Sequence, residues 1–256
     1  MKFIILSALR QIVFIVYLIF FLCPHAFAQR QSTNNQTGWY MYFGNHHLND
    51  KWGLHLEAQL RRAEIISKPQ QLLIRTGINY YLSKSAFLTA GYAFIETYPY
   101  GDFAVKASFP EHRLWEQLQL NSQQGIFEWT SRFRLEQRFS KLPVLVGDEY
   151  KPGDAIYTNR FRILNKFSIP LSGKVIVDNS LYAAVYDEFM INFGNKVGNN
   201  IFDQNRAAIS LGYKLPKLGR IELGYMYQKI FKADGIKVEN NHTLMVGLTS
   251  NLPLYK

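Results

Sequence analysis

Cysteine is nearly absent from this sequence, with Cys23 the single example in 256 residues. Cys23 lies in an N-terminal segment that we expect to be removed, so the mature chain has no thiol. That composition excludes disulfide bonds and thiolate metal sites, and it fits a protein of an oxidising envelope compartment.

Long apolar runs and helical patterns are also missing after residue 28. No later stretch approaches about 20 consecutive apolar residues, which excludes a transmembrane helix from that part of the chain. There is no linker or low-complexity tract, so we expect residues 29–256 to form one domain. The sequence also lacks the HExxH, GxSxG, P-loop and dinucleotide-binding motifs.

The first 28 residues match a secretory signal peptide. Lys2 and Arg10 supply positive charge, residues 12–22 are continuously apolar, and Ala26-Phe27-Ala28 fits the small-x-small cleavage rule. We therefore predict cleavage after Ala28. An uncleaved membrane helix is the alternative, and the shortness of the apolar run argues against it.

Basic residues outnumber acidic ones, with 29 Lys and Arg against 19 Asp and Glu and a net charge of +10. Loss of residues 1–28 removes two basic groups and no acidic one, which leaves +8. A basic balance often indicates nucleic-acid binding, but here the basic residues are spaced by two along the chain instead of clustered. We therefore expect no nucleic-acid partner.

Strict alternation of apolar and charged residues is the most informative pattern that is present. From Phe127 to Phe139 the odd positions are mostly Phe, Trp and Leu, and the even positions are Glu, Thr, Arg, Arg, Glu and Arg. Successive side chains of a strand point to opposite faces, so one face is apolar and the other charged. Long strands of this kind behind an export signal predict a transmembrane up-and-down antiparallel β-barrel of the outer membrane. Outer-membrane lipid and the barrel-assembly machinery would be its partners.

Eleven strand segments can be predicted from alternation and turn residues. Short and long connections alternate between them, as periplasmic turns and external loops do in outer-membrane barrels. Because bacterial barrels of this type have an even number of strands, we predict twelve, with one further strand around residues 30–37, or alternatively ten. A soluble β-sandwich is the competing fold, and the strand lengths and sorted loops argue against it. The segments are residues 38–45, 52–62, 70–81, 86–98, 111–121, 126–139, 157–170, 174–187, 203–215, 219–231 and 241–252.

The charged faces should line the barrel interior, because each Arg or Lys placed in hydrocarbon at mid-depth costs roughly 2–4 kcal/mol. Glu96 and Glu116 break this rule. We expect a net-positive lumen that is either a passive pore for small anionic solutes or a barrel filled by salt bridges. The candidate lumen-lining residues are Glu57, Arg61, Arg75, Arg113, Arg132, Arg134, Glu136, Arg138, Arg160, Arg162, Arg206 and Glu222.

Five stretches also carry a family resemblance: residues 113–118 (RLWEQL), 131–139 (SRFRLEQRF), 186–189 (YDEF), 202–206 (FDQNR) and 223–226 (LGYM). With them the chain resembles, from about Trp39 to its end, an uncharacterised outer-membrane β-barrel family, a domain of unknown function of Gram-negative bacteria. The resemblance implies a β-barrel in the outer membrane. It implies no substrate, catalytic residue or cofactor.

Two polar stretches flank the predicted loop 188–202 and could meet at one rim of the barrel. They contribute Asp187, Glu188, Asp203 and Asn205. Oxygen ligands of this kind suit a calcium ion, but no EF-hand spacing occurs, and we favour a hydrogen-bond network that fastens the loop. We therefore predict no metal site and no cofactor.

A hydrolase of the outer membrane is a separate functional class. Its general base would come from the histidines, but no Ser or Asp partner follows at a recognisable spacing. His55 would share the lumen face with Glu57, which makes a pair but not a site. We expect a monomeric barrel without catalytic activity. The histidines after residue 28 are His46, His47, His55, His112 and His242.

Overall fold

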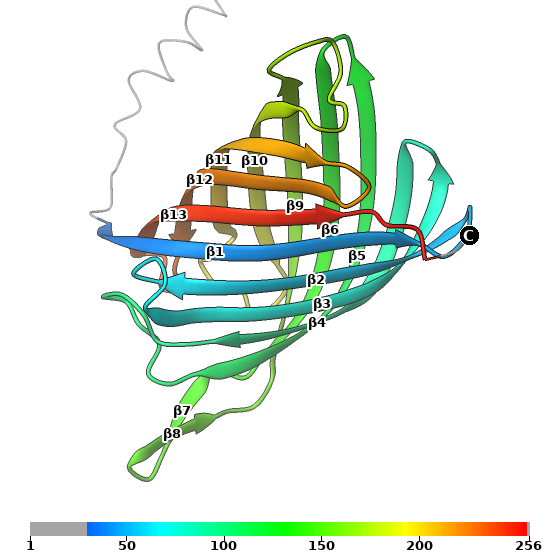
Figure 1. Cartoon of the computed structure of the whole chain (residues 1–256). Coiled ribbons are helices and arrows are strands. Elements are labelled where there is room, and N and C mark those ends of the chain that lie inside the picture. The colour runs from blue at the N-terminus through cyan, green and yellow to red at the C-terminus, as the bar shows by residue number, and fades with distance from the viewer. Residues whose placement is uncertain (1–29, 255–256) are drawn as a thin grey trace, which may run out of the picture. The chain divides into compact units, whose positions relative to one another are not determined.

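The computed structural model describes residues 30–254, and this part of the chain is built from β-strands without helices. Eleven strands form one closed barrel, and two more form a separate hairpin within the β6–β9 connection (Figure 1). The predicted export signal, residues 1–28, lies outside the described residues. The barrel strands are β1 (Gln31–His47), β2 (Trp52–Ala63), β3 (Lys68–Ser83), β4 (Ala86–Thr97), β5 (Phe109–Gln124), β6 (Phe127–Ser140), β9 (Ile156–Pro170), β10 (Leu181–Phe193), β11 (Phe202–Leu215), β12 (Gly219–Phe231) and β13 (Lys237–Ser250), and the hairpin strands are β7 (Pro143–Val146) and β8 (Glu149–Pro152).

Residues 30–254 contain no helix with the length and hydropathy of a membrane span.

The barrel closes through a parallel pair of strands. In Figure 1 the blue β1 and the red β13 lie side by side and run in the same direction, with Gln31 opposite Lys237 and Gly44 opposite Ser250. All other neighbouring strands of the barrel are antiparallel. A fully antiparallel ring requires an even number of strands, so a ring of eleven requires one parallel pair. The prediction of twelve strands, or of ten, is therefore wrong.

Residues 31–37, which we expected as a separate strand, instead form the first half of β1. Their polar side chains are paired across the seam with β13. Asn35 Nδ2 donates a hydrogen bond to Asn241 Oδ1 at 2.9 Å, and the hydroxyls of Thr37 and Thr243 are 2.7 Å apart. Such cross-strand polar pairs stabilise a strand that alternation of apolar residues would not predict.

The second difference from the prediction concerns β10. We expected a strand over residues 174–187 after a three-residue turn, but residues 171–180 are a connection and β10 begins at Leu181. Asn179 has a positive φ of 61°, and Ser180 Oγ donates to the Val177 carbonyl at 2.5 Å, so a local turn ends this segment. Ile176 from this loop is buried against Tyr182 of β10. The loop thus folds against the inner face of the barrel.

Most of the longer connections leave the same end of the barrel. Residues 98–108, 141–155 and 194–201 connect strands at this end, which we call the long-loop rim. The opposite end, the short-turn rim, carries turns of two to four residues and the single longer loop 171–180.

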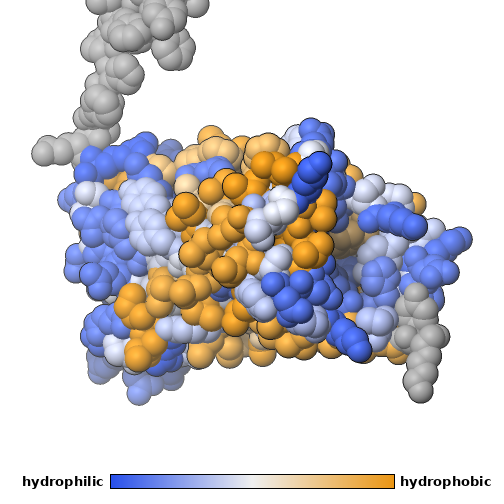
Figure 2. Space-filling model, turned by 45° about the horizontal axis from the view of Figure 1, so that its top comes forward, coloured by the Kyte–Doolittle hydropathy of each residue, from blue (hydrophilic) through white to orange (hydrophobic). Residues whose placement is uncertain are grey.

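An apolar belt surrounds the outer wall of the barrel. Figure 2 shows it as an orange zone between polar ends, and Ile209, Leu211 and Leu223 are each 59% exposed within it. The two acidic exceptions also face outward. Glu96 lies near the end of β4 at the long-loop rim, and Glu116 lies in mid-strand, where it accepts a hydrogen bond from Gln137 Nε2 at 3.0 Å.

Candidate functional site: the ion-paired lumen

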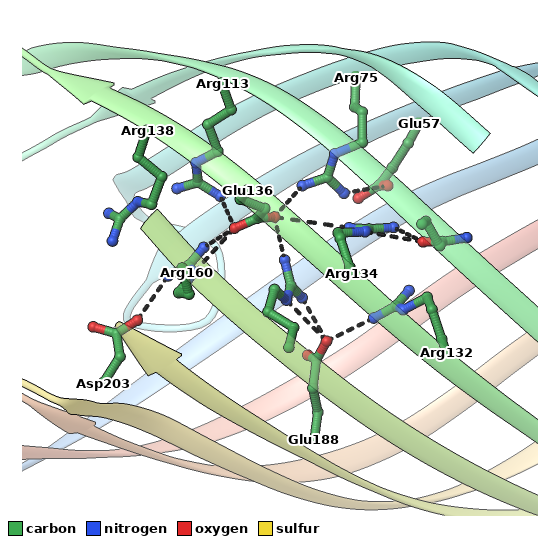
Figure 3. A network of polar contacts seen from close by, with 12 residues as sticks. Glu57, Arg75, Arg113, Arg132, Arg134, Glu136, Arg138, Arg160, Glu188 and Asp203 are labelled. Atoms are coloured by element: carbon green, nitrogen blue, oxygen red, sulfur yellow. Dashed lines mark hydrogen bonds and ion pairs between the residues drawn. The ribbon is translucent and has the colours of Figure 1, made fainter. Parts of the chain in front are cut away.

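Glu136 of β6 is the centre of the lumen. Its side chain is fully buried, and its two carboxylate oxygens face guanidinium groups from three other strands. Arg160 donates to Oε2 from Nε at 2.9 Å and from Nη2 at 2.6 Å, and Arg162 donates to Oε1 at 2.8 Å. Arg75 and Arg113 contact the same carboxylate at 3.2 and 3.4 Å. One carboxylate therefore ties β3, β5, β6 and β9 together across the interior (Figure 3).

Four further carboxylates extend this arrangement in different directions. Glu57 pairs with Arg75 at 2.5 Å, and Asp203 pairs with Arg160 at 2.7 Å. Glu188 accepts hydrogen bonds from three arginines, Arg132, Arg162 and Arg206, and Glu111 pairs with Arg113 and Arg138. Charge-assisted bonds to a planar guanidinium fix both partners in orientation, so the interior is rigid as well as charged.

We call the connected set the lumen network. It has five carboxylates and eight arginines, so it carries an excess of three positive charges. Its members are Glu57, Glu111, Glu136, Glu188, Asp203, Arg75, Arg113, Arg132, Arg134, Arg138, Arg160, Arg162 and Arg206.

Trp115 packs beside this network on the inner face of β5. The guanidinium carbons of Arg75 and Arg134 lie 5.3 and 4.8 Å from the ring centroid, and Arg134 also donates two hydrogen bonds to Gln117 Oε1. Space for the indole comes from a glycine, because a Cβ on Gly77 would lie 3.0 Å from the Trp115 ring. The indole therefore supplements the ion pairs of Arg75, and the Gln117 amide binds Arg134, whose ion-pair contact with Glu136 is long at 4.0 Å.

The network closes the middle of the lumen. A barrel of about eight strands is just wide enough to be filled by side chains, so eleven strands need long ones to meet at the axis. Arginine and glutamate supply that length here. Arg75, Arg134, Glu136 and Glu188 are each no more than 2% exposed, which means that water has almost no access at this level.

A smaller ionic group lies nearer the short-turn rim. Arg220 pairs with Glu128 at 2.7 Å, Lys166 pairs with Glu222, and Tyr182 donates to Glu222 Oε1 at 2.7 Å. Together with the loop that buries Ile176, these groups occupy the lumen below the network.

A cavity of about 220 Å³ remains at the long-loop rim, between the network and the β4–β5 loop, residues 98–108. The loop crosses the mouth, since Tyr100 donates to Glu239 Oε2 of β13 at 2.8 Å. Burial, aided by the Glu239 carboxylate, raises the pKa of Tyr100 above its usual range. The hydroxyl thus stays protonated and continues to donate at neutral pH.

The twelve residues predicted to line the lumen all lie on the inner face. Ten belong to the lumen network. Glu222 belongs to the lower group, and Arg61 lies in the wall of the cavity. Alternation along each strand accounts for this inward placement, because the neighbouring positions in these strands carry exposed apolar residues on the outer face.

The four residues predicted to meet at one rim are instead divided between two faces. Glu188 and Asp203 point into the lumen network. Asp187 and Asn205 face outward, where Asn205 Nδ2 donates to Asp187 Oδ1 at 3.0 Å. The prediction placed a loop at residues 188–202, but β10 continues to Phe193, so neighbouring residues alternate between faces.

The histidines do not share one environment. His55 is buried, lies 3.4 Å from Glu57 Oε2 and contacts Asn45 Oδ1 through Nδ1 at 2.8 Å. His112 and His242 contact tyrosine hydroxyls on the outer wall. Within residues 30–254 no group of three or more His, Cys, Asp or Glu side chains is arranged to hold a metal ion.

The sequence reasoning missed the aromatic and amide partners of the network. Trp39 and Trp115 are 3% and 1% exposed and face inward, whereas Trp52 and Trp129 face outward. The sequence contains a signal for the inward position of Trp115, because Trp115 is two residues from both Arg113 and Gln117 and therefore shares their strand face.

The class of protein that the fold and interior define is a closed, all-β barrel with an ion-paired lumen. A family model described as "Protein of unknown function (DUF2490)" matches residues 36–240, and the chain belongs to this family. The expected resemblance to an uncharacterised family is thereby confirmed. None of the curated proteins matches the chain.

Proposed function

We propose that this protein is an outer-membrane barrel whose lumen is closed to passive flow, with a structural or receptor role in the envelope. The observation that carries the proposal is the complete burial of Glu136 among five arginines. An open pore needs a continuous water column, and the lumen network occupies the level where that column would pass. The salt-bridge-filled barrel is therefore favoured over the anion pore.

The outer-membrane location is supported by the apolar outer belt and by the predicted export signal. Charged groups that would be costly in hydrocarbon are gathered inside, and the apolar side chains are outside. The partners in this proposal are outer-membrane lipid and the machinery that inserts barrels.

Substitution of Leu223 by arginine tests the lipid contact. Leu223 is at the middle of β12 on the outer wall, so Leu223→Arg should lower the free energy of unfolding by roughly 2–4 kcal/mol in lipid vesicles. The control is Ile236→Arg, since Ile236 is similarly exposed but lies in the β12–β13 loop beyond the belt. Urea unfolding in vesicles measures both. Equal effects of the two substitutions would contradict the lipid-facing wall.

Planar-bilayer recording of the purified wild-type barrel tests the closed lumen. We expect insertion without stable conductance steps, because the middle of the lumen network, at Arg134 and Glu136, is closed to water. Insertion is checked by protease protection of the same sample in vesicles. A persistent conductance with anion preference would restore the pore in place of this proposal.

A further inference from the structure

Arg61 at the end of β2 is the buried arginine that the lumen network leaves out. It is 8% exposed. Its polar contacts within the described chain are the amide oxygens of Gln59 and Gln71, at 2.5–3.0 Å. Its guanidinium carbon stacks over Trp39 at 3.7 Å from the ring centroid. A buried cation without a carboxylate is costly unless another negative group reaches it.

Arg206 of β11 is the second guanidinium beside Trp39. Its Cζ lies 4.8 Å from the same ring centroid. It pairs with Glu188 through Nη1 at 3.1 Å and with Gln204 through Nη2 at 3.0 Å, but its buried Nε has no hydrogen-bond partner. Two arginines with spare donors therefore converge on one aromatic ring.

Both arginines line the cavity at the long-loop rim. Its wall contains six arginines and Lys232, against three acids, Glu111, Asp203 and Glu239. Those acids are already paired, with Arg113 and Arg138, with Arg160, and with Lys232. The uncompensated charge of the cavity is thus positive. Arg61 has no carboxylate partner within the described chain, and Arg206 shares Glu188 with Arg132 and Arg162.

The remaining wall is mixed. Amides such as those of Gln70 and Gln228 contribute polar groups, and Phe103 and Val105 of the β4–β5 loop, with Phe109 and Ile230, form an apolar part. Its volume of about 220 Å³ is below the range of roughly 300–1,000 Å³ that suits drug-sized ligands. The chemistry that fits is a small anion with one apolar side.

We propose that this cavity binds a small organic carboxylate, with the carboxylate held by Arg61 and Arg206 and the apolar part packed against the β4–β5 loop. Planar carboxylates match the guanidinium fork, and the anion would supply the negative charge that Arg61 lacks. The site faces the long-loop rim, so its occupation requires no passage through the lumen network. The inference goes beyond the closed barrel and does not depend on it.

Isothermal titration of the full-length mature barrel in detergent, with benzoate as the probe, tests this site. Benzamide, the neutral counterpart, should bind at least about tenfold more weakly. Arg61→Gln should weaken benzoate binding by a similar factor. The matched control is Arg62→Gln, because Arg62 is the next residue, points away from the lumen and contacts the carbonyls of Ile66 and Ser67. It should leave the affinity unchanged within about twofold.

The thermal midpoint without ligand separates binding from a structural role. Arg61→Gln leaves no carboxylate unpaired, so its midpoint should equal or exceed that of the wild type. If this variant fails to fold, Arg206→Lys decides, since it keeps a cation beside Glu188 and removes Nε. Failure of benzoate to bind, binding of inorganic phosphate without benzoate, or full affinity in the deciding variant would overturn the proposal.

Discussion

Replacing Glu136 with glutamine should destabilise the barrel by roughly 3–5 kcal/mol, measured by urea unfolding in detergent with tryptophan fluorescence. Glutamine has the same shape, so packing is preserved while the charge is lost. Five guanidinium groups would then face a buried neutral amide, and repulsion among them would no longer be offset.

Glu116→Gln is the matched control. Glu116 also lies in mid-strand, but it faces outward, and its side-chain hydrogen bond within residues 30–254 is with Gln137. Its neutralisation should leave stability unchanged or increase it, because in the proposed membrane location a carboxylate on the outer wall is unfavourable. If Glu136→Gln unfolds within about 1 kcal/mol of the wild type, the network does not stabilise the barrel as argued here.

Truncating the centre of the network should convert a silent barrel into a conducting one. The combined change Arg134→Ala, Glu136→Ala, Arg162→Ala and Glu188→Ala removes two cations and two anions. Six arginines and three carboxylates of the network remain, so the excess of three positive charges is retained. In planar bilayers we expect conductance to rise by on the order of tenfold or more over the wild-type background, with an anion preference.

The control for this variant removes an ion pair that does not reach the lumen. Glu64 and Lys68 form an exposed pair at the long-loop rim, and their double alanine variant should remain silent. Both variants are checked for folding by resistance to unfolding in SDS at room temperature. A folded but silent truncation variant would show that another element, such as the loop containing Ile176, closes the barrel.

Much of the wall could be predicted from the sequence because alternation has a simple physical cause. From Phe127 to Phe139, a two-residue period and a large difference in solvation energy between faces leave one arrangement, and β6 has it. The same reasoning placed Arg75 and Arg206 inside. Partners could not be predicted this way, because alternation does not give the order of the strands or their register. Arg160 lies opposite Glu136 on β9, and Arg75 reaches the same carboxylate from β3, which does not neighbour β6.

Strand number and local boundaries required information that the pattern does not contain. Residues 31–37 are polar on both faces, and they form a strand because Thr37 and Asn35 pair with β13, some 206 residues away. Conversely, Val175 to Val177 has the composition of a strand, but the turn at Asn179 ends it. We predicted that β10 begins at residue 174 and ends at residue 187, so residues 188–193 were assigned to a loop. In the structure β10 continues to Phe193, and the four residues expected at one rim lie on two faces of the wall.

The parallel seam has a consequence for how the molecule is made. It joins the first strand to the last, so the cylinder cannot be sealed before nearly the whole polypeptide has arrived. Until then the arginine and glutamate side chains keep their hydration shells. Sealing strips that water in a single late event, and contacts between such distant positions form slowly. Dehydration of the ionic interior and completion of the seam are therefore one and the same step in biogenesis.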